Sequence, residues 1–176
     1  MRQLTRERIE SLLTELGERL AAQGVAARIY VVGGAALALE WDARRSTRDI
    51  DAVLQPATTV MEIAAQMSRE RHLPPGWLSD AATAFVPARD DGLLGRTLAV
   101  FDRVAIVIAP AEHLLAMKMG AFRQTDMADL RLLVRHLGLT TPKQIADLCE
   151  QVYGPDSLVL PSREDLLWQA DVILTT

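Results

Sequence analysis

Apolar side chains recur at intervals of three and four residues near the start of the chain, which predicts an amphipathic helix. They are Leu4, Ile9, Leu12, Leu13, Leu16 and Leu20, and Gly24 follows them. The apolar run at 28–32 predicts a strand that ends at two glycines, Gly33 and Gly34. A short helix is expected over 35–41, and the alternation of polar and apolar residues over 47–54 predicts a second strand.

The rest of the chain is predicted to contain a helix, a β-meander and then further helices. Thr59 and Glu62 form a capping-box signature for a helix that ends near residue 71. Short β-runs follow at 84–86, 97–101 and 104–109, with helices expected at 110–137, at 142–153 and after Ser162. This order predicts an α+β fold with a small sheet of about five strands. We expect one compact unit, with a core over 1–138 and a helical C-terminal extension over 139–176.

Composition and charge exclude several classes of protein. The 176 residues are 49% hydrophobic and 24% charged, which is typical of a soluble globular protein. The net charge of −4 removes any general attraction to nucleic acid or an anionic membrane, although a local basic patch stays open. The single cysteine, Cys149, excludes an internal disulfide framework. The charged N-terminus is unlike a signal peptide, and the longest apolar stretch, 29–39, is too short to cross a bilayer. We therefore expect a cytoplasmic protein with no membrane partner.

The segment 30–54 carries the most chemical information. Gly33 and Gly34 lie between a predicted strand and helix, where a phosphate can approach the backbone N–H groups at the helix N-terminus. Asp49 and Asp51 are two positions apart on a predicted strand, so both carboxylates would point to the same face. Carboxylate oxygens together with nucleotide phosphates are the ligands that Mg²⁺ prefers. Taken alone, the two glycines could form a tight turn and the two aspartates could lie on a solvated strand edge. Their combination favours phosphoryl or nucleotidyl transfer.

A lysine and an aspartate interrupt the apolar face of the helix predicted over 110–137. Lys118 and Asp129 are eleven residues apart, so a continuous helix would place them on one face, about 16 Å apart. In one interpretation, Lys118 reaches a triphosphate and Asp129 orients a basic group. In the other, Lys118 extends toward solvent and Asp129 caps a break near Thr125. Asp126 is less well aligned with Lys118 and is a weaker candidate.

These motifs resemble the nucleotidyltransferase superfamily, the fold of DNA polymerase beta. More narrowly, the chain is similar to the AbiEii-like and related minimal nucleotidyltransferases of bacterial toxin–antitoxin systems. The resemblance rests on three segments: Gly33-Gly34-Ala35-Ala36-Leu37, Arg45-Ser46-Thr47-Arg48-Asp49-Ile50-Asp51, and Leu114-Leu115-Ala116-Met117-Lys118 with Arg123, Asp126 and Asp129.

The resemblance implies a mixed sheet packed against helices and an enzyme that moves a nucleoside monophosphate from an NTP to an acceptor. Asp49 and Asp51 would bind Mg²⁺, while Gly33, Gly34, Arg48 and Lys118 would contact the nucleotide phosphates. Asp49, Asp51, Lys118 and Asp129 would be the catalytic residues. The acceptor would be a tRNA 3′ end or a protein hydroxyl. The protein would be a toxin that has a cognate antitoxin protein as its partner.

One departure from the superfamily pattern keeps other functions open. The superfamily often has a third metal carboxylate on a later strand, but residues 104–109 contain none, and Asp102 at their entrance is a weak substitute. The alternatives are a non-catalytic nucleotidyltransferase-like binding module and a transferase that acts on a small molecule of the aminoglycoside type.

Overall fold

The computed structural model describes residues 3–42, 46–87, 95–154 and 156–175, so Arg45 of the predicted motif lies outside the described residues. The chain clusters into two compact units. The first comprises residues 1–84 and 92–109, and the second comprises residues 85–91 and 110–176. The predicted division after residue 138 falls inside the second unit.

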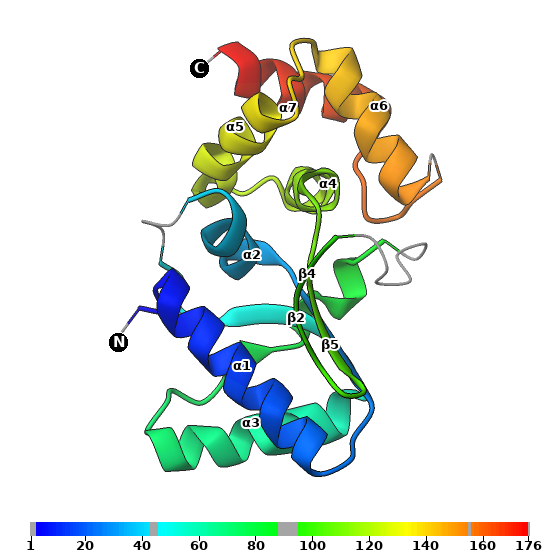
Figure 1. Cartoon of the computed structure of the whole chain (residues 1–176). Coiled ribbons are helices and arrows are strands. Elements are labelled where there is room, and N and C mark those ends of the chain that lie inside the picture. Colours follow the sequence, from blue (N-terminus) through cyan, green and yellow to red (C-terminus); the bar gives the residue numbers. More distant parts are fainter. Residues whose placement is uncertain (1–2, 43–45, 88–94, 155, 176) are drawn as a thin grey trace. The chain divides into compact units, whose positions relative to one another are not determined.

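The first unit is built on a mixed sheet with helices packed against it (Figure 1). Its helices are α1 (Arg6–Ala22), α2 (Gly33–Glu40) and α3 (Ala57–Arg71). Its strands are β1 (Ala27–Val31), β2 (Ile50–Gln55), β3 (Leu78–Ser79), β4 (Arg96–Phe101) and β5 (Val104–Ile108). Within the described residues these five strands form one sheet in the order β3-β2-β1-β5-β4. The predicted sheet of about five strands is confirmed.

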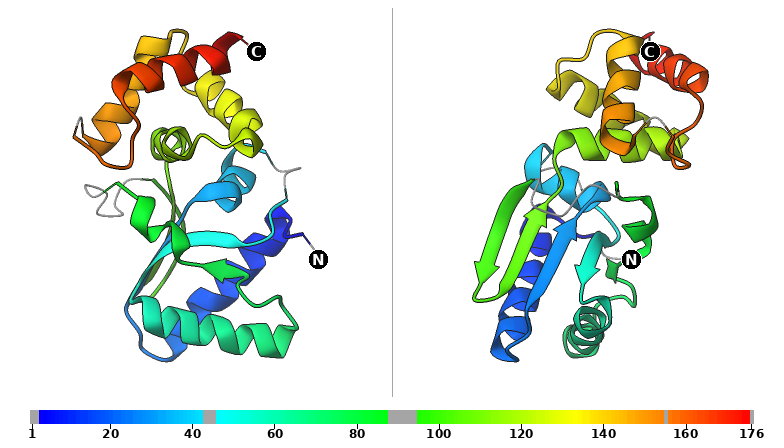
Figure 2. Two further views of the ribbon diagram at one scale, coloured as in Figure 1. Left: turned by 180° about the vertical axis from the view of Figure 1, so that it is seen from behind. Right: turned by 90° about the vertical axis from the view of Figure 1, so that its right-hand side faces the viewer.

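Parallel and antiparallel pairs alternate across the sheet. β1 runs parallel to β5 and antiparallel to β2, while β2 runs parallel to β3 and β4 runs antiparallel to β5. Figure 2 shows β1 and β5 side by side and pointing the same way. The β4–β5 hairpin turns at Asp102 and Arg103 as predicted, and Asp102 adopts a left-handed conformation (φ 50°).

One face of the sheet is buried beneath α1. Side chains that alternate along the central strands, among them Ile29, Ala52 and Ile106, are fully buried on this face. Gly17 of α1 marks a close approach, because a Cβ there would lie 2.4 Å from the Phe101 ring and 3.4 Å from Ile106 Cδ1. α3 packs beside α1 and against β2. The apolar stripe predicted for the first helix is therefore the stripe that covers the sheet.

The second unit is helical. Its elements are α4 (Ala111–Ala121), α5 (Met127–His136), α6 (Pro142–Tyr153) and α7 (Arg163–Thr175), with the short 3₁₀ helix η2 (Gln124–Asp126) before α5. α4 packs against α5 and α6, and α7 packs against α5 and α6. Thr141 and Gln144 form a reciprocal capping box at the start of α6. Cys149 of α6 is fully buried.

Three local predictions were wrong. The helix expected over 110–137 is two helices, because Phe122 ends α4 in a left-handed conformation (φ 38°). Of the segment expected as a strand at 84–86, residues 84 and 85 belong to the 3₁₀ helix η1 (Ala81–Phe85). Thr59 lies inside α3, which begins after Pro56 without a side-chain cap. No helix among the described residues combines the length and the apolar character needed to cross a membrane.

Candidate functional site

Asp51 lies directly beside the glycine turn that ends β1. The N–H of Val32 donates to the Asp51 carbonyl at 2.9 Å, which sets the end of β1 opposite Asp51 on β2. Gly33 then begins α2 with φ +64°. A Cβ on Gly33 would lie 3.1 Å from Asp51 Oδ2, so the carboxylate lies against the glycine backbone. The structure thus brings together one residue from each of the two predicted motifs, Gly33 and Asp51.

The N-terminus of α2 offers backbone donors at this point. Its N-cap, Val32, has no side chain that can accept the N–H groups of the first turn, and the first turn contains no acidic residue. The helix is anchored because residues 35–39 are fully buried. Gly34, the second helical residue, is half-buried. The first N–H groups of a helix have no partner within the helix, and with the helix dipole they favour an anion at this end of α2.

Asp49 and Arg48 lie in the bend that precedes β2. β2 begins at Ile50, so Asp49 is outside the strand, two positions before Asp51; both aspartates are half-buried and Arg48 is exposed. The bend is tied to the N-terminal segment, because Leu4 and Thr47 exchange two backbone hydrogen bonds of 2.7 and 3.0 Å. The backbone at Thr47 is therefore held in place, while the side chain of the adjacent Arg48 is exposed to solvent.

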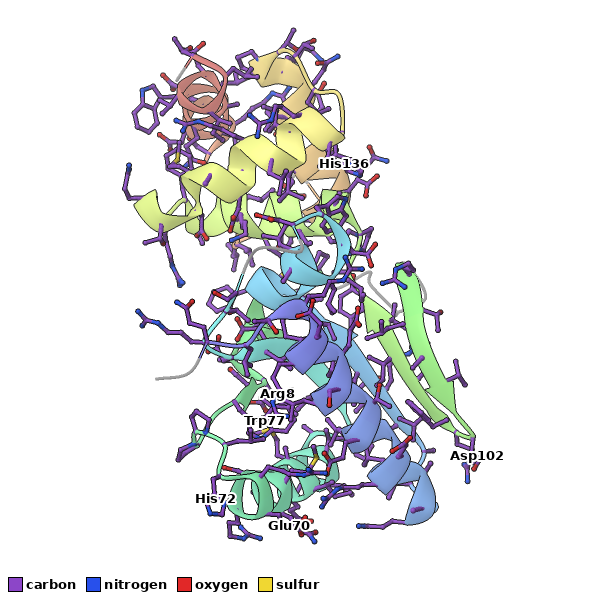
Figure 3. The ribbon with its side chains drawn as sticks, turned by 60° about the vertical axis from the view of Figure 1, so that its left-hand side comes forward. Arg8, Glu70, His72, Trp77, Asp102 and His136 are labelled. Carbon is purple, nitrogen blue, oxygen red and sulfur yellow. The ribbon has the colours of Figure 1, made fainter. Side chains whose placement is uncertain are left out.

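Asp102 lies at the other end of the sheet from Asp51. The β4–β5 turn that carries Asp102 is next to Val104, which pairs with Ala27 at the start of β1, whereas Asp51 faces Val32 beyond the end of β1. Five strand residues separate these ends, which is roughly 16 Å. Figure 3 shows Asp102 at the tip of the hairpin. Asp102 therefore cannot complete a metal site with Asp51, and the described residues contain no cluster of three or more potential His, Cys, Asp or Glu ligands.

In the second unit, Lys118 forms a compact ion cluster with two aspartates. Its Nζ lies 2.5 Å from Asp126 Oδ1 and 2.9 Å from Asp129 Oδ2. The side chains are 13% exposed for Lys118, 17% for Asp126 and only 2% for Asp129. The expected separation of about 16 Å along one helix was wrong, because the break after α4 folds α5 back toward Lys118. Asp126, the weaker candidate from the sequence, is the closer partner.

Ser79 is a polar residue beside Asp51 that the sequence did not indicate. It belongs to the two-residue strand β3, and the register pairs it with Asp51 on β2. Both residues are half-buried, while their neighbours Leu78 and Ile50 are fully buried on the other face. A strand of two residues has no hydrophobic period, so its pairing could not be derived from the pattern of the sequence.

Comparison of the chain with models of protein families gave one family whose model spans these features. A family model described as "Nucleotidyltransferase of unknown function (DUF6036)" matches residues 7–156 of the chain. The chain belongs to this nucleotidyltransferase family. Comparison with curated proteins and with solved structures gave no match. The matched region includes the glycine turn, both aspartates of the first unit and the Lys118 cluster.

Membership in this nucleotidyltransferase family agrees with the architecture of the chain. The mixed five-stranded sheet with packed helices, followed by a helical C-terminal region, fits an α+β nucleotidyltransferase fold. The predicted fold class and the predicted superfamily are therefore confirmed. The narrower resemblance to AbiEii-like proteins remains a prediction.

Proposed function

We propose that this nucleotidyltransferase family member is a Mg²⁺-dependent enzyme that transfers a nucleoside monophosphate from an NTP to a hydroxyl acceptor. One observation carries the proposal: the Asp51 carboxylate lies against Gly33 at the N-terminus of α2, so close that a Cβ added to Gly33 would lie 3.1 Å from Asp51 Oδ2. A carboxylate that can bind a cation and a turn that can accept a phosphate are thus immediate neighbours. An NTP with its metal requires both at one point.

Asp49 and Asp51 carry carboxylates, a type of group that binds Mg²⁺. Proteins commonly bind this ion through one or two carboxylates while substrate phosphates and water complete its shell. Both aspartates are only half-buried, so a bound ion would remain accessible to a nucleotide. Mg²⁺ would supply charge neutralisation at the reacting phosphates and would align the acceptor oxygen with the α-phosphate.

The proposed reaction is a simple exchange of bonds at phosphorus. The acceptor oxygen forms a bond to the α-phosphorus, the bond between the α-phosphorus and its bridging oxygen breaks, and pyrophosphate leaves. The acceptor proton passes to a carboxylate of the Asp49–Asp51 pair or to water. Gly33 and Gly34 would hold the triphosphate through backbone N–H groups, and Arg48 would pair with a phosphate.

We further propose that Lys118 and Asp129 are catalytic residues. Lys118 would neutralise triphosphate charge, and Asp129 would hold its ammonium group in place through the 2.9 Å ion pair. Both side chains have low exposure, and a buried charge that loses its partner is strongly destabilising. The ion pair therefore supports a fixed position for the ammonium group.

The proposal is tested by transfer of label from each of four α-³²P NTPs, with Mg²⁺, onto total tRNA and onto protein. Asp51→Asn should reduce transfer by at least about 100-fold, because even outer-shell partners of a metal contribute 10–100-fold. Asp102→Asn is the matched control: it removes a carboxylate at the opposite end of the same sheet, and Asn tolerates the left-handed conformation found there. Transfer that persists unchanged in well-folded Asp51→Asn would refute the site.

The class of molecule that accepts the label distinguishes the proposed function from its two alternatives. We propose RNA, in particular tRNA, or a protein as the acceptor, in agreement with the resemblance to toxins that have a cognate antitoxin. Label on a small molecule alone would favour the aminoglycoside-type alternative. Mg²⁺-dependent NTP binding without any transfer would favour the non-catalytic module. Growth arrest on expression of the wild type, but not of Asp51→Asn, would support the toxin role.

A further inference from the structure

The two-residue strand β3 is held beside Asp51 by a buried tryptophan. Trp77 is 2% exposed, and its indole Nε1 donates to the Ala64 carbonyl of α3 at 3.1 Å. The Trp77 carbonyl in turn accepts the N–H of Ile50 at 2.8 Å. Figure 3 labels Trp77 beside α3, between the helix and the sheet. A short strand has few hydrogen bonds of its own, so this anchor fixes its position.

The anchored register places Ser79 on the same face of the sheet as Asp51. Ile50 pairs with Leu78 and Asp51 pairs with Ser79. The first pair is fully buried and the second is half-buried, so burial confirms the alternation that the register requires. Neighbouring strands lie about 4.8 Å apart. Asp51 therefore has Ser79 on one side and the end of β1, with Gly33, on the other.

The Ser79 hydroxyl is oriented by a local hydrogen bond. Its Oγ accepts the N–H of Ala81 at 3.3 Å, at the start of η1. One lone pair of the oxygen is thus used by the backbone, and the hydroxyl proton is the group that can be donated. A donor beside a carboxylate and a turn of backbone N–H groups suits a ligand with several anionic oxygens, such as a metal-bound triphosphate.

We propose that Ser79 is a further nucleotide-binding residue, whose hydroxyl donates a hydrogen bond to a phosphate oxygen of the NTP held at Asp51 and Gly33. The proposal rests on the proposed function and extends its site to a third strand. Ser79 contacts the phosphate and not the metal, so the hydroxyl contributes to nucleotide affinity and not to affinity for the cation alone.

The experiment compares Ser79→Ala and Ser79→Thr with the wild type in the full chain. Mg²⁺-ATP, Mg²⁺-GTP, Mg²⁺-CTP and Mg²⁺-UTP are titrated in turn, and Mn²⁺ alone is titrated as the probe of the carboxylates. Ser79→Ala should weaken binding of the preferred NTP by about 10-fold or more, because hydrogen bonds to charged groups are among the stronger ones. Ser79→Thr keeps the hydroxyl in a strand that favours β-branched residues and should stay within about threefold of the wild type. Mn²⁺ affinity should be unchanged in both.

Ser68→Ala is the matched control. Ser68 is also half-buried in the first unit, but its hydroxyl donates to the Leu73 carbonyl at the end of α3. This variant should bind NTP as the wild type does.

A folded Ser79→Ala with unaltered NTP affinity, or one that loses Mn²⁺ and NTP affinity together, overturns the role of Ser79. A wild type that binds neither Mn²⁺ nor NTP overturns the proposed function itself, and the role of Ser79 with it. If Ser79→Ala does not fold, loss of NTP affinity in Ser79→Thr decides against the proposal.

Discussion

Lys118 and Asp129 are joined by an ion pair of 2.9 Å although they belong to different helices, α4 and α5. The residue that makes this possible is Phe122, which ends α4 with φ 38°. A left-handed conformation is costly for a bulky residue and persists only where the surroundings hold it. Here the Phe122 ring packs edge-on against Trp168, with ring centroids 6.0 Å apart. The break in the helix thus assembles the charge cluster.

Lys118→Met should destabilise the protein strongly. The substitution removes the cation that lies 2.9 Å from Asp129 Oδ2, on a side chain that is only 2% exposed. Removing one member of a buried pair costs about 3–5 kcal/mol. The free energy of unfolding, measured by urea denaturation, should fall by that amount. Lys143→Met is the control, because Lys143 is 75% exposed in its pair with Asp147 and should change stability by less than about 1 kcal/mol. Equal effects of the two substitutions would contradict this account.

Gly33→Ala should lower the free energy of unfolding by more than the backbone strain at this position explains, and it should also weaken ligand binding at the candidate site. A Cβ at this position combines φ +64° with a contact of 3.1 Å to Asp51 Oδ2. Gly24 has a similar φ of +68° but nothing within 4 Å of the same added atom, so Gly24→Ala reports the strain by itself, about 1 kcal/mol. We expect Gly33→Ala to exceed that loss and also to weaken Mg²⁺-NTP binding, while Gly24→Ala leaves binding intact. Titration of both variants with NTP checks the second point.

Gly17→Ala should destabilise the wild type but not a variant with a smaller residue at 101. The added Cβ would lie 2.4 Å from Phe101 Cδ2, and such overpacking typically costs about 1–3 kcal/mol. Ala is the better helix former by about 1 kcal/mol, so the sign should reverse once the ring is gone. A double-mutant cycle with Phe101→Ala, followed by urea denaturation, measures this coupling. Additive effects would show that α1 can move away from β4 freely.

Stability should decline at high pH because of Cys149. Burial, helped by the negative charge of Glu150, raises the pKa of this thiol from its usual 9.0 to about 12. The unfolded chain therefore loses the thiol proton at lower pH than the folded one. The contribution of the protonated Cys149 thiol to the free energy of unfolding is complete below pH 9. It falls by about 1.4 kcal/mol per pH unit as the pH rises toward 12. Denaturation of the wild type and of Cys149→Ala between pH 8 and 11 should show a shallower slope in the variant. Some slope will remain, because burial also raises the pKa of the Tyr153 hydroxyl.

Local patterns predicted those elements whose signals lie within a few neighbouring residues. The hairpin at Asp102 combines two short β-runs with a turn, and α6 has its cap at Thr141 directly before its first helical residue. The same approach extended α4 through Phe122, because the apolar period continues there, although one interpretation of Asp129 allowed a break near Thr125. Phe122 contacts Trp168, which is 46 positions away in the sequence, and a contact at that separation is not visible in a local pattern.

The sequence by itself determined the chemistry that is available: a glycine turn, two aspartates at strand spacing, and a lysine with two aspartates further along. These features are short-range, since backbone freedom and side-chain alternation are properties of adjacent residues. The tertiary structure alone decided which of them meet. Asp51 faces Gly33 through the β1–β2 pairing, Ser79 reaches Asp51 through a strand anchored by Trp77, and Asp102 is carried to the far end of the sheet. Strand register and helix packing join residues that are distant in the chain, and these depend on the whole core and not on any one segment.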